Sequence, residues 1–251
     1  MLTIRAVPAF QDNYIWLIQA VNSKDILIVD PGDAEPVIAV VQQHQLKPVA
    51  ILITHHHADH IGGIDKLVAK YNIPVYDSNN SFINTNNLLA AKESFPDISI
   101  LAVAGHTADH IAFLIDNNLF CGDTLFGAGC GRLLGGTADQ LFNSLALLAK
   151  LPPDTNIYCA HEYTLANLAF AVMVEPNNST IQQRIKETQL LRQQGKPSLP
   201  STIELELKTN PFLRCDFESV KQAVEKKYGQ QLGSPQQVFT MLRKWKDNFR
   251  G

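Results

Sequence analysis

The sequence has no long uncharged apolar run, and its first residues show no basic region followed by an apolar core. A membrane-spanning helix needs about 20 consecutive apolar residues, and a secretory leader needs both of those N-terminal features. Residues 1–5 instead begin with the alternation of a β-strand. We therefore expect a cytoplasmic protein with no membrane partner.

Cysteine is scarce as well. Cys121, Cys130, Cys159 and Cys215 are scattered and lack the close pairing of a structural zinc site. No Cys/His pairing is visible, so a catalytic thiol is the less favoured alternative. We expect reduced and mostly buried cysteines, as in a protein of a reducing compartment.

The chain lacks an excess of either charge, since its formal net charge is −3. No basic arm or patch is evident for a phosphate backbone, which disfavours an RNA-processing nuclease and any nucleic-acid partner. The length of 251 residues allows one large domain, or a main domain with a smaller one attached.

The densest group of metal-binding side chains follows a short apolar, β-branched run. Side chains alternate along a strand, so His55 and His57 should share one face while His56 points away. With Asp59 and His60, the donors follow in the order His-x-His-x-Asp-His. A lone histidine at a strand end is usually structural, and a purification tag is an unbroken run at a terminus. This internal pattern instead predicts a metal site, with too many donors for one small ion.

Short apolar runs alternate with helical patterns in the first part of the chain, which predicts a layered α/β fold. Asp30 ends one of these runs, and is either an acceptor for a histidine N–H or a turn residue. A hairpin is expected around residues 116–117. The expected strands are residues 4–6, 14–18, 25–29, 50–53, 74–77, 98–103, 111–115 and 118–121, and the expected helices are residues 35–45 and 64–71.

Three further donors, His110, Asp123 and His161, each follow a predicted strand. Functional groups in layered α/β folds collect at strand ends. Together with the first four donors they make seven ligands, which two metal ions sharing one bridging carboxylate would use. We expect His44 at the surface, while His106 either bonds to a ligand or packs beneath the site.

Five glycines within residues 127–136 allow the backbone to approach a ligand closely, although their order matches no phosphate-binding fingerprint. Thr137 and Gln140 have the spacing of a capping box, which predicts a helix through Leu148.

Beyond about residue 162 the pattern becomes helical, which predicts a small helical domain. Arg243 and Lys246 are three residues apart and should share a face of the last helix. On spacing alone, a solvated basic face is the favoured interpretation. The expected helices are residues 165–174, 181–194, 217–228 and 235–248, the last opened by a Ser-Pro pair.

With these positions assembled, the chain resembles the hydroxyacylglutathione hydrolase (glyoxalase II) family of the metallo-β-lactamase superfamily over nearly its whole length. The first histidine motif is shared by the superfamily, whereas Gly-Cys-Gly, His-Glu-Tyr and the helical tail are more specific to the family. The residues that carry the resemblance are 10–16, 54–60, 105–110, 122–124, 129–131, 161–164 and 210–212.

The resemblance implies a four-layer αββα metallo-β-lactamase sandwich with a small C-terminal all-helical domain. The catalytic domain would cover residues 1–164, and the helical substrate-binding domain residues 165–251. Two divalent metal ions are implied, with zinc expected and iron or manganese as alternatives.

The resemblance also implies a role for each site residue. His55, His57 and His110 would hold one metal, and Asp59, His60 and His161 the other, with Asp123 bridging. Asp59, His60 and Asp123 would be the catalytic residues, and the glutathione contacts would be Arg132, Tyr163, Arg243 and Lys246. Leu134 departs from the pattern, because relatives can carry a tyrosine at this position.

The implied activity is hydrolysis of the S-D-lactoylglutathione thioester to D-lactate and glutathione by a metal-bridging hydroxide. This is the second step of methylglyoxal detoxification, and a monomer is expected. A mononuclear-iron glutathione persulfide dioxygenase of the same superfamily is the main alternative, and it would use one iron. A non-catalytic binding module is disfavoured because no ligand of the set is missing.

Overall fold

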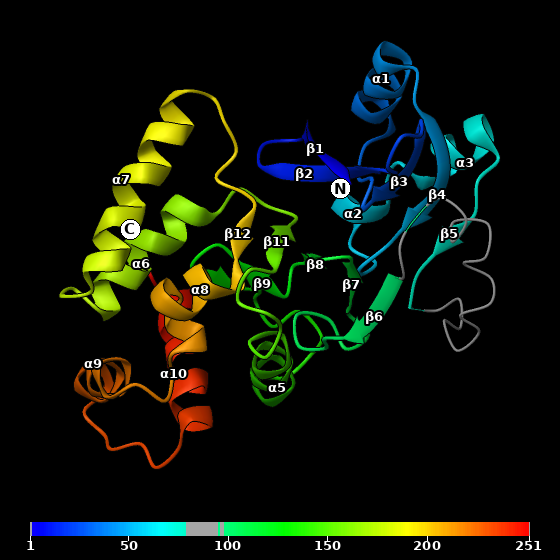
Figure 1. The fold of residues 1–251 in the computed structure, drawn as a ribbon. Coiled ribbons are helices and arrows are strands. Elements are labelled where there is room, and N and C mark those ends of the chain that lie inside the picture. The colour runs from blue at the N-terminus through cyan, green and yellow to red at the C-terminus, as the bar shows by residue number, and fades with distance from the viewer. Residues whose placement is uncertain (1, 79–94, 96–97, 251) are drawn as a thin grey trace. The chain divides into compact units, whose positions relative to one another are not determined.

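The computed structural model describes residues 2–78, 95 and 98–250. The chain forms two compact units (Figure 1). The first unit comprises Met1–Ala102 and Asp109–Gly122, and the second comprises Val103–Ala108 and Asp123–Gly251. The domain boundary that we place between residues 164 and 165 stays a prediction.

The first unit contains a five-stranded mixed sheet in the order β1-β2-β3-β4-β5. The first three strands are antiparallel, and β4 and β5 continue the sheet in parallel pairing. Parallel neighbours need a crossover, which α1 supplies between β3 and β4. The strands are β1 (Thr3–Ala9), β2 (Asn13–Gln19), β3 (Asp25–Val29), β4 (Lys47–Leu52) and β5 (Val75–Tyr76), and the helices are α1 (Ala34–His44), α2 (Ala58–Ile61) and α3 (Ile64–Tyr71).

Helices α1 and α3 cover one face of this sheet. Ile15, Ile28 and Ile51 of the sheet belong to the same buried cluster as Val37 of α1 and Leu67 of α3. Strand β2 is buried at six consecutive positions, so side chains on both of its faces are shielded from water. Such burial explains why the central strands read as nearly continuous apolar runs, as in other sheets that are covered on both faces.

The first unit also contains the antiparallel strands β6 (Ile98–Ala102), β7 (Ile111–Ile115) and β8 (Asn118–Gly122). Ile115 pairs with Asn118, so Asp116 and Asn117 form a two-residue turn. Asp116 has a φ of 55°, as the hairpin turns that match strand twist require. The predicted hairpin is therefore confirmed.

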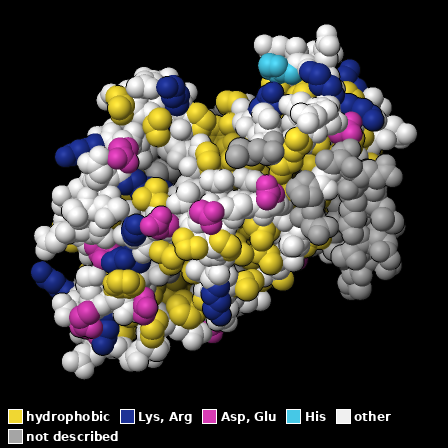
Figure 2. All heavy atoms as spheres, viewed as in Figure 1, with side chains coloured by type: hydrophobic (Ala, Val, Ile, Leu, Met, Phe, Trp, Pro, Cys, Tyr) yellow, Lys and Arg dark blue, Asp and Glu magenta, His cyan; other side chains and the backbone are white. Residues whose placement is uncertain are grey.

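The second unit is mainly helical. Figure 2 shows basic and acidic side chains interspersed over its helical elements on the face in view. Its antiparallel strand pairs are β9 (Leu125–Phe126) with β10 (Gly129–Cys130), and β11 (Asn156–Cys159) with β12 (Ser201–Thr202). Its helices are α5 (Ala138–Leu148), α6 (Thr164–Val174), α7 (Ser179–Gln193), α8 (Ile203–Thr209), the 3₁₀ helix η1 (Pro211–Leu213), α9 (Glu218–Tyr228) and α10 (Pro235–Asp247).

Helix ends in this unit follow the sequence signals. The Thr137 hydroxyl accepts from the Gln140 amide at 3.2 Å, and the Gln140 side chain accepts from the Thr137 amide at 2.8 Å. This reciprocal pair is the predicted capping box of α5. The Ser234 side chain likewise caps α10, with Pro235 at its first position. Phe212 packs in a run of ring contacts between Phe170 and Phe239, which joins η1 to α6 and α10.

The expectation for the cysteines is met, and several short elements, α8 among them, were not predicted. All four cysteines are free and buried, as expected. Helix α8 was not predicted, because its sequence Ile-Glu-Leu-Glu-Leu-Lys-Thr alternates like a strand and spans only seven residues. Its N-terminal cap by Thr202 and the burial of Glu206 favour the helix instead. Among the described residues, none of the helices combines the length and apolar character that crossing a bilayer requires.

Candidate functional site

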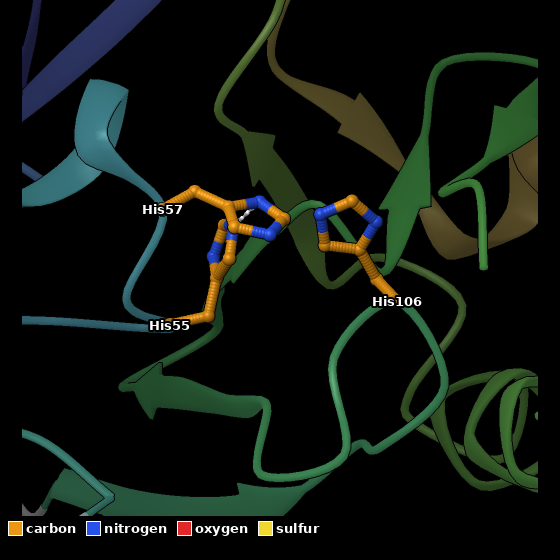
Figure 3. A group of neighbouring side chains, drawn as sticks. All are labelled: His55, His57 and His106. Carbon is orange, nitrogen blue, oxygen red and sulfur yellow. Dashed lines mark hydrogen bonds between the residues drawn. The ribbon is translucent and has the colours of Figure 1, made fainter. Parts of the chain in front are cut away.

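The first histidine cluster lies in the segment that follows β4. His55 is buried, and its Nε2 shares a hydrogen bond with His57 Nδ1 at 3.0 Å (Figure 3). The two side chains are neighbours, as expected, although β4 ends at Leu52 and neither residue is part of a strand. His106, the third histidine labelled in Figure 3, belongs to the second unit.

Asp30 fixes the orientation of His60. The two side chains are buried, and His60 Nδ1 donates to Asp30 Oδ2 at 3.0 Å. Asp30 also accepts from the backbone amide and the hydroxyl of Thr54, at 2.8 and 2.7 Å. An ionised carboxylate only accepts, so Nδ1 carries the proton and Nε2 keeps its lone pair for a metal. Of the two roles left open for Asp30, the structure supports the acceptor for a histidine N–H.

Asn13 holds Asp59 in a similar way. Its side-chain amide donates to Asp59 Oδ2 at 3.0 Å and to the Asp59 carbonyl oxygen at 3.5 Å. Asp59 Oδ2 lies 3.6 Å from His60 Nε2. Metal–ligand bonds of about 2.0–2.2 Å are compatible with one ion between two donors at this separation. The role of Asn13 was not inferred from the sequence, although this residue lies within the 10–16 stretch that carries the family resemblance.

His110 completes the group of predicted ligands in the first unit. Its ring stacks on His55 with centroids 4.6 Å apart, and its Nδ1 is 3.0 Å from the Ile111 carbonyl oxygen. The His55 and His60 ring centroids are 4.1 Å apart. His56 instead contacts Asp77 at 3.0 Å. Five of the seven predicted ligands therefore belong to this unit: His55, His57, Asp59, His60 and His110.

The other two predicted ligands, Asp123 and His161, belong to the second unit and contact each other. His161 Nε2 lies 3.3 Å from Asp123 Oδ1, and His106 Nε2 lies 3.5 Å from Asp123 Oδ2. His106 Nδ1 is 2.8 Å from the carbonyl oxygen of Arg132, to which it donates. His106 thus bonds to the Arg132 carbonyl oxygen and lies near the carboxylate of a predicted ligand, and which of its two expected roles it has stays a prediction. A carboxylate with one imidazole at each oxygen has the donor chemistry of a divalent-metal site.

The four predicted glutathione contacts line one cavity of about 430 Å³ in the second unit. A cavity of this size falls in the usual range for small-molecule sites. The lining includes cations, an aromatic ring stacked on His161 and the exposed side chain of Leu134. The predicted contacts in the lining are Arg132, Tyr163, Arg243 and Lys246. That these residues bind glutathione stays a prediction.

Arg243 is a buried cation, with 3% of its surface exposed. Its guanidinium donates to the carbonyl oxygens of Cys130 and Gly131 at 3.0 and 3.4 Å, and lies 2.9 Å from Asp247. The solvated basic face that spacing alone favours is therefore wrong for this residue. Spacing cannot reveal this burial, because it results from packing against a loop more than 100 residues earlier in the chain.

Lys246 lies beside Arg243 and is partly buried. Its Nζ donates to the Ala166 carbonyl oxygen at 3.1 Å and lies over the rings of Phe170 and Phe249. Burial, and then the charge of Arg243, lower the pKa of Lys246 to about 8. This ammonium group is thus poised to lose its charge within a mildly alkaline range.

Burial acts on the Cys130 thiol in the same cavity. It raises the thiol pKa to about 11, while the neighbouring charge of Arg243 partly offsets the effect. A catalytic thiol at this position is therefore disfavoured, because the thiolate is the nucleophilic form.

We expect Asp30→Ala to lower metal affinity about 10–100-fold, the usual effect of removing the hydrogen-bond partner of a ligating histidine. His60 would lose the acceptor that fixes its ring. Competition against a chromophoric chelator measures the change. Asp65→Ala, which removes an exposed carboxylate of α3, is the matched control. Unchanged affinity in a folded Asp30→Ala protein would contradict the orienting role.

The similarity to known proteins covers the whole chain. Residues 162–249 match the family model described as hydroxyacylglutathione hydrolase C-terminus, and residues 10–81 match that of the metallo-beta-lactamase superfamily. A hydroxyacylglutathione hydrolase of Nitrosomonas europaea is 47% identical, over 100% of this chain and 98% of that protein. One of Aliivibrio salmonicida is 49% identical, over 99% of this chain and 100% of that protein.

Solved structures show the same fold. The structure of TTHA1623 in a di-iron-bound form covers 84% of this chain and 100% of that one, with a TM-score of 0.57 and 26% identity. ETHE1 from Myxococcus xanthus covers 98% of each chain with a TM-score of 0.60, but its 21% identity shows the fold alone. The predicted metallo-β-lactamase fold with a helical C-terminal region is thereby confirmed. The chain belongs to the hydroxyacylglutathione hydrolase family of the metallo-β-lactamase superfamily.

Proposed function

We propose that this protein hydrolyses the thioester bond of S-D-lactoylglutathione and related S-hydroxyacylglutathiones, releasing D-lactate and glutathione. The observation that carries this proposal is the cation-lined cavity of the second unit. Tyr163, Arg243 and Lys246 of its lining lie within residues 162–249, which match the hydroxyacylglutathione hydrolase C-terminus. Glutathione carries two carboxylates, and Lys246 and Arg132 offer donors suited to them.

The donor set suits divalent metal ions. Histidine and carboxylate donors bind zinc, iron and manganese alike. We propose two ions per chain, zinc in the first instance, while a di-iron form is known for TTHA1623. One ion would be held by His55, His57 and His110, the other by Asp59, His60 and His161, and both by Asp123.

Bound divalent ions supply a water that ionises near neutral pH and polarise the carbonyl that it attacks. The chain's own residues set the geometry for that chemistry. Asp30 holds the His60 ring by its Nδ1 proton, and Asn13 holds the Asp59 carboxylate. The thiolate of glutathione is a good leaving group, so the site needs no strong general acid.

The direct test is hydrolysis of S-D-lactoylglutathione by the purified protein, with metal content measured on the same sample. We expect turnover that is lost on chelation and restored by metal, and much weaker turnover of a small thioester that lacks glutathione. A protein with one iron that consumes oxygen with glutathione persulfide, and leaves the thioester intact, would support the dioxygenase instead.

The pKa of Lys246 predicts a pH-dependent KM. A lysine binds a carboxylate in its protonated form, and Lys246 loses its proton as the pH rises through about 8. KM for the glutathione thioester should therefore be lowest below pH 8 and rise above it. The rise in KM should not exceed about tenfold to a hundredfold, since a hydrogen bond to a charged group contributes roughly 1.5–3 kcal/mol.

Measuring KM on both sides of pH 8, with the uncatalysed hydrolysis subtracted, checks this expectation. Lys246→Arg is the matched control, because arginine stays protonated throughout this range. A rise in KM of the same size in Lys246→Arg would assign the titration to another group.

We also propose that the protein is a cytoplasmic monomer with a small-molecule substrate and no nucleic-acid or membrane partner. The modest net charge of −3 supports the part of this proposal that concerns nucleic acid. Light scattering of the purified protein at working concentration tests the oligomeric state.

A further inference from the structure

Cys130 forms part of the cavity wall. It belongs to residues 127–131, which comprise the turn after β9, strand β10 and Gly131, and which we call the glycine loop. The backbone conformation of the loop is one that few residue types can adopt. Ala128 has a φ of 55°, in the left-handed region that residues with a Cβ seldom adopt. A Cβ added to Gly129 would collide with the side-chain amide of Asn167. A loop with three glycines in five residues does not hold such a shape through its own propensity.

Glu206 of α8 contacts this loop from a fully buried position, with 0% of its surface exposed. Its Oε2 accepts from the Ala128 amide at 2.8 Å and from the Asn210 side chain at 3.0 Å. Asn210 in turn donates to the Gly129 carbonyl oxygen at 2.9 Å. The carboxylate and the amide together satisfy the donor of one loop residue and the acceptor of the next.

The other oxygen of Glu206 is fixed by a buried cation. Arg184 of α7 donates to Oε1 at 2.6 Å, and the Ser201 hydroxyl donates to the same atom at 2.5 Å. Arg184 also donates to the Thr209 hydroxyl at 2.5 Å. The carboxylate thus makes four hydrogen bonds and has little freedom to turn. A buried ion pair is seldom more stabilising than apolar residues of the same shape would be. We therefore expect the pair of Glu206 and Arg184 to matter mainly because it fixes the orientation of the Glu206 carboxylate.

We propose that Glu206, held by Arg184, is a positioning residue that shapes the glycine loop and thereby the affinity of the cavity for its ligand. This role rests on the proposed function, in which that cavity binds the glutathione part of the substrate. Glu206 does not line the cavity and acts only through the Ala128 amide and Asn210. The helices after residue 162 would therefore contribute to the substrate site in two ways. They supply cations that line it, and they hold the glycine loop in its conformation.

The first variant is Glu206→Gln, which keeps the shape and removes the charge. Its single carbonyl oxygen should turn to Arg184, which leaves an NH₂ group facing the Ala128 N–H. We expect KM for S-D-lactoylglutathione to rise about tenfold with kcat nearly unchanged, as for the loss of roughly one hydrogen bond to a charged group. Amide hydrogen exchange of residues 127–131 should become faster, with metal content unchanged.

Glu206→Asp is the second variant, for the case in which the glutamine leaves Arg184 unpaired and the protein does not fold. It keeps the negative charge for Arg184 but is one methylene too short to reach both partners, so exchange in the loop and KM should again rise. Glu204→Gln is the matched control. It makes the same change of glutamate to glutamine at an exposed position of α8, where Glu204 contacts Lys208 and not the loop, and should leave KM and loop exchange unchanged.

Loop exchange and KM at the wild-type level in folded Glu206→Gln or Glu206→Asp would overturn the proposal. Faster exchange confined to α7 and α8, with unchanged KM, would do so as well, since it indicates a purely structural ion pair. The exchange measurement needs no turnover. A wild-type protein that does not hydrolyse the thioester, but whose loop loosens in the variants, would therefore refute the proposed function and leave the positioning of the loop standing.

Discussion

Asp123→Asn should lose metal and activity together. Asp123 presents its two oxygens to His161 and His106 at 3.3 and 3.5 Å, and we propose that it holds both ions. Four protein ligands bind a structural zinc ion with roughly 10–16 kcal/mol, or about 3 kcal/mol for each ligand. Loss of one charged ligand should therefore weaken binding by roughly a hundredfold or more, and kcat/KM should fall at least as far.

Metal content after dialysis against a chelator, measured beside kcat/KM, checks this expectation. Asp139→Asn is the matched control, because that carboxylate is exposed in the first turn of α5. Two ions retained per chain with full turnover in Asp123→Asn would be incompatible with a bridging role.

Arg243→Met should lower the stability of the protein as well as its affinity for the substrate, whereas Lys246→Met should lower the affinity alone. Removing the guanidinium leaves the Cys130 and Gly131 carbonyl oxygens without this donor, and a buried acceptor left unsatisfied costs about 1–3 kcal/mol of unfolding free energy. The melting temperature should fall, and KM for the glutathione thioester should rise. Lys246→Met should raise KM about tenfold to a hundredfold with little loss of stability, because Lys246 is only partly buried.

Thermal melts and kinetics with a glutathione thioester and a small thioester separate the two effects. A selective loss on the glutathione substrate, steeper at low salt, indicates recognition of its carboxylates. Equal losses on both substrates would point to damage in the fold or the metal centre. An Arg243→Met protein as stable as the wild type would show that the buried guanidinium is not a structural partner of the loop.

Local rules could predict much of the fold. The two-residue spacing of His55 and His57 predicted that they are neighbours, and the spacing of Thr137 and Gln140 located the start of α5. These features depend on residues at most three positions apart, where sequence order and spatial neighbourhood coincide.

Long-range partnerships could not be predicted in the same way. Asn13 reaches Asp59 across 46 positions, and Glu206 reaches Ala128 across 78. Their pairing results from sheet register and helix packing, which no short pattern encodes. The same reason explains why Arg243 reads as a surface cation on helical spacing and proves to be buried.

The protonation of Cys130 has a consequence for behaviour under oxidising stress. With a pKa of about 11, the thiol is ionised in roughly one molecule in ten thousand at pH 7. Exchange with glutathione disulfide requires the thiolate, so a mixed disulfide should form slowly even where glutathione itself is bound nearby, as we propose. Although the Cys130 thiol forms part of the cavity wall, the cavity should therefore remain unmodified when the ratio of oxidised to reduced glutathione changes.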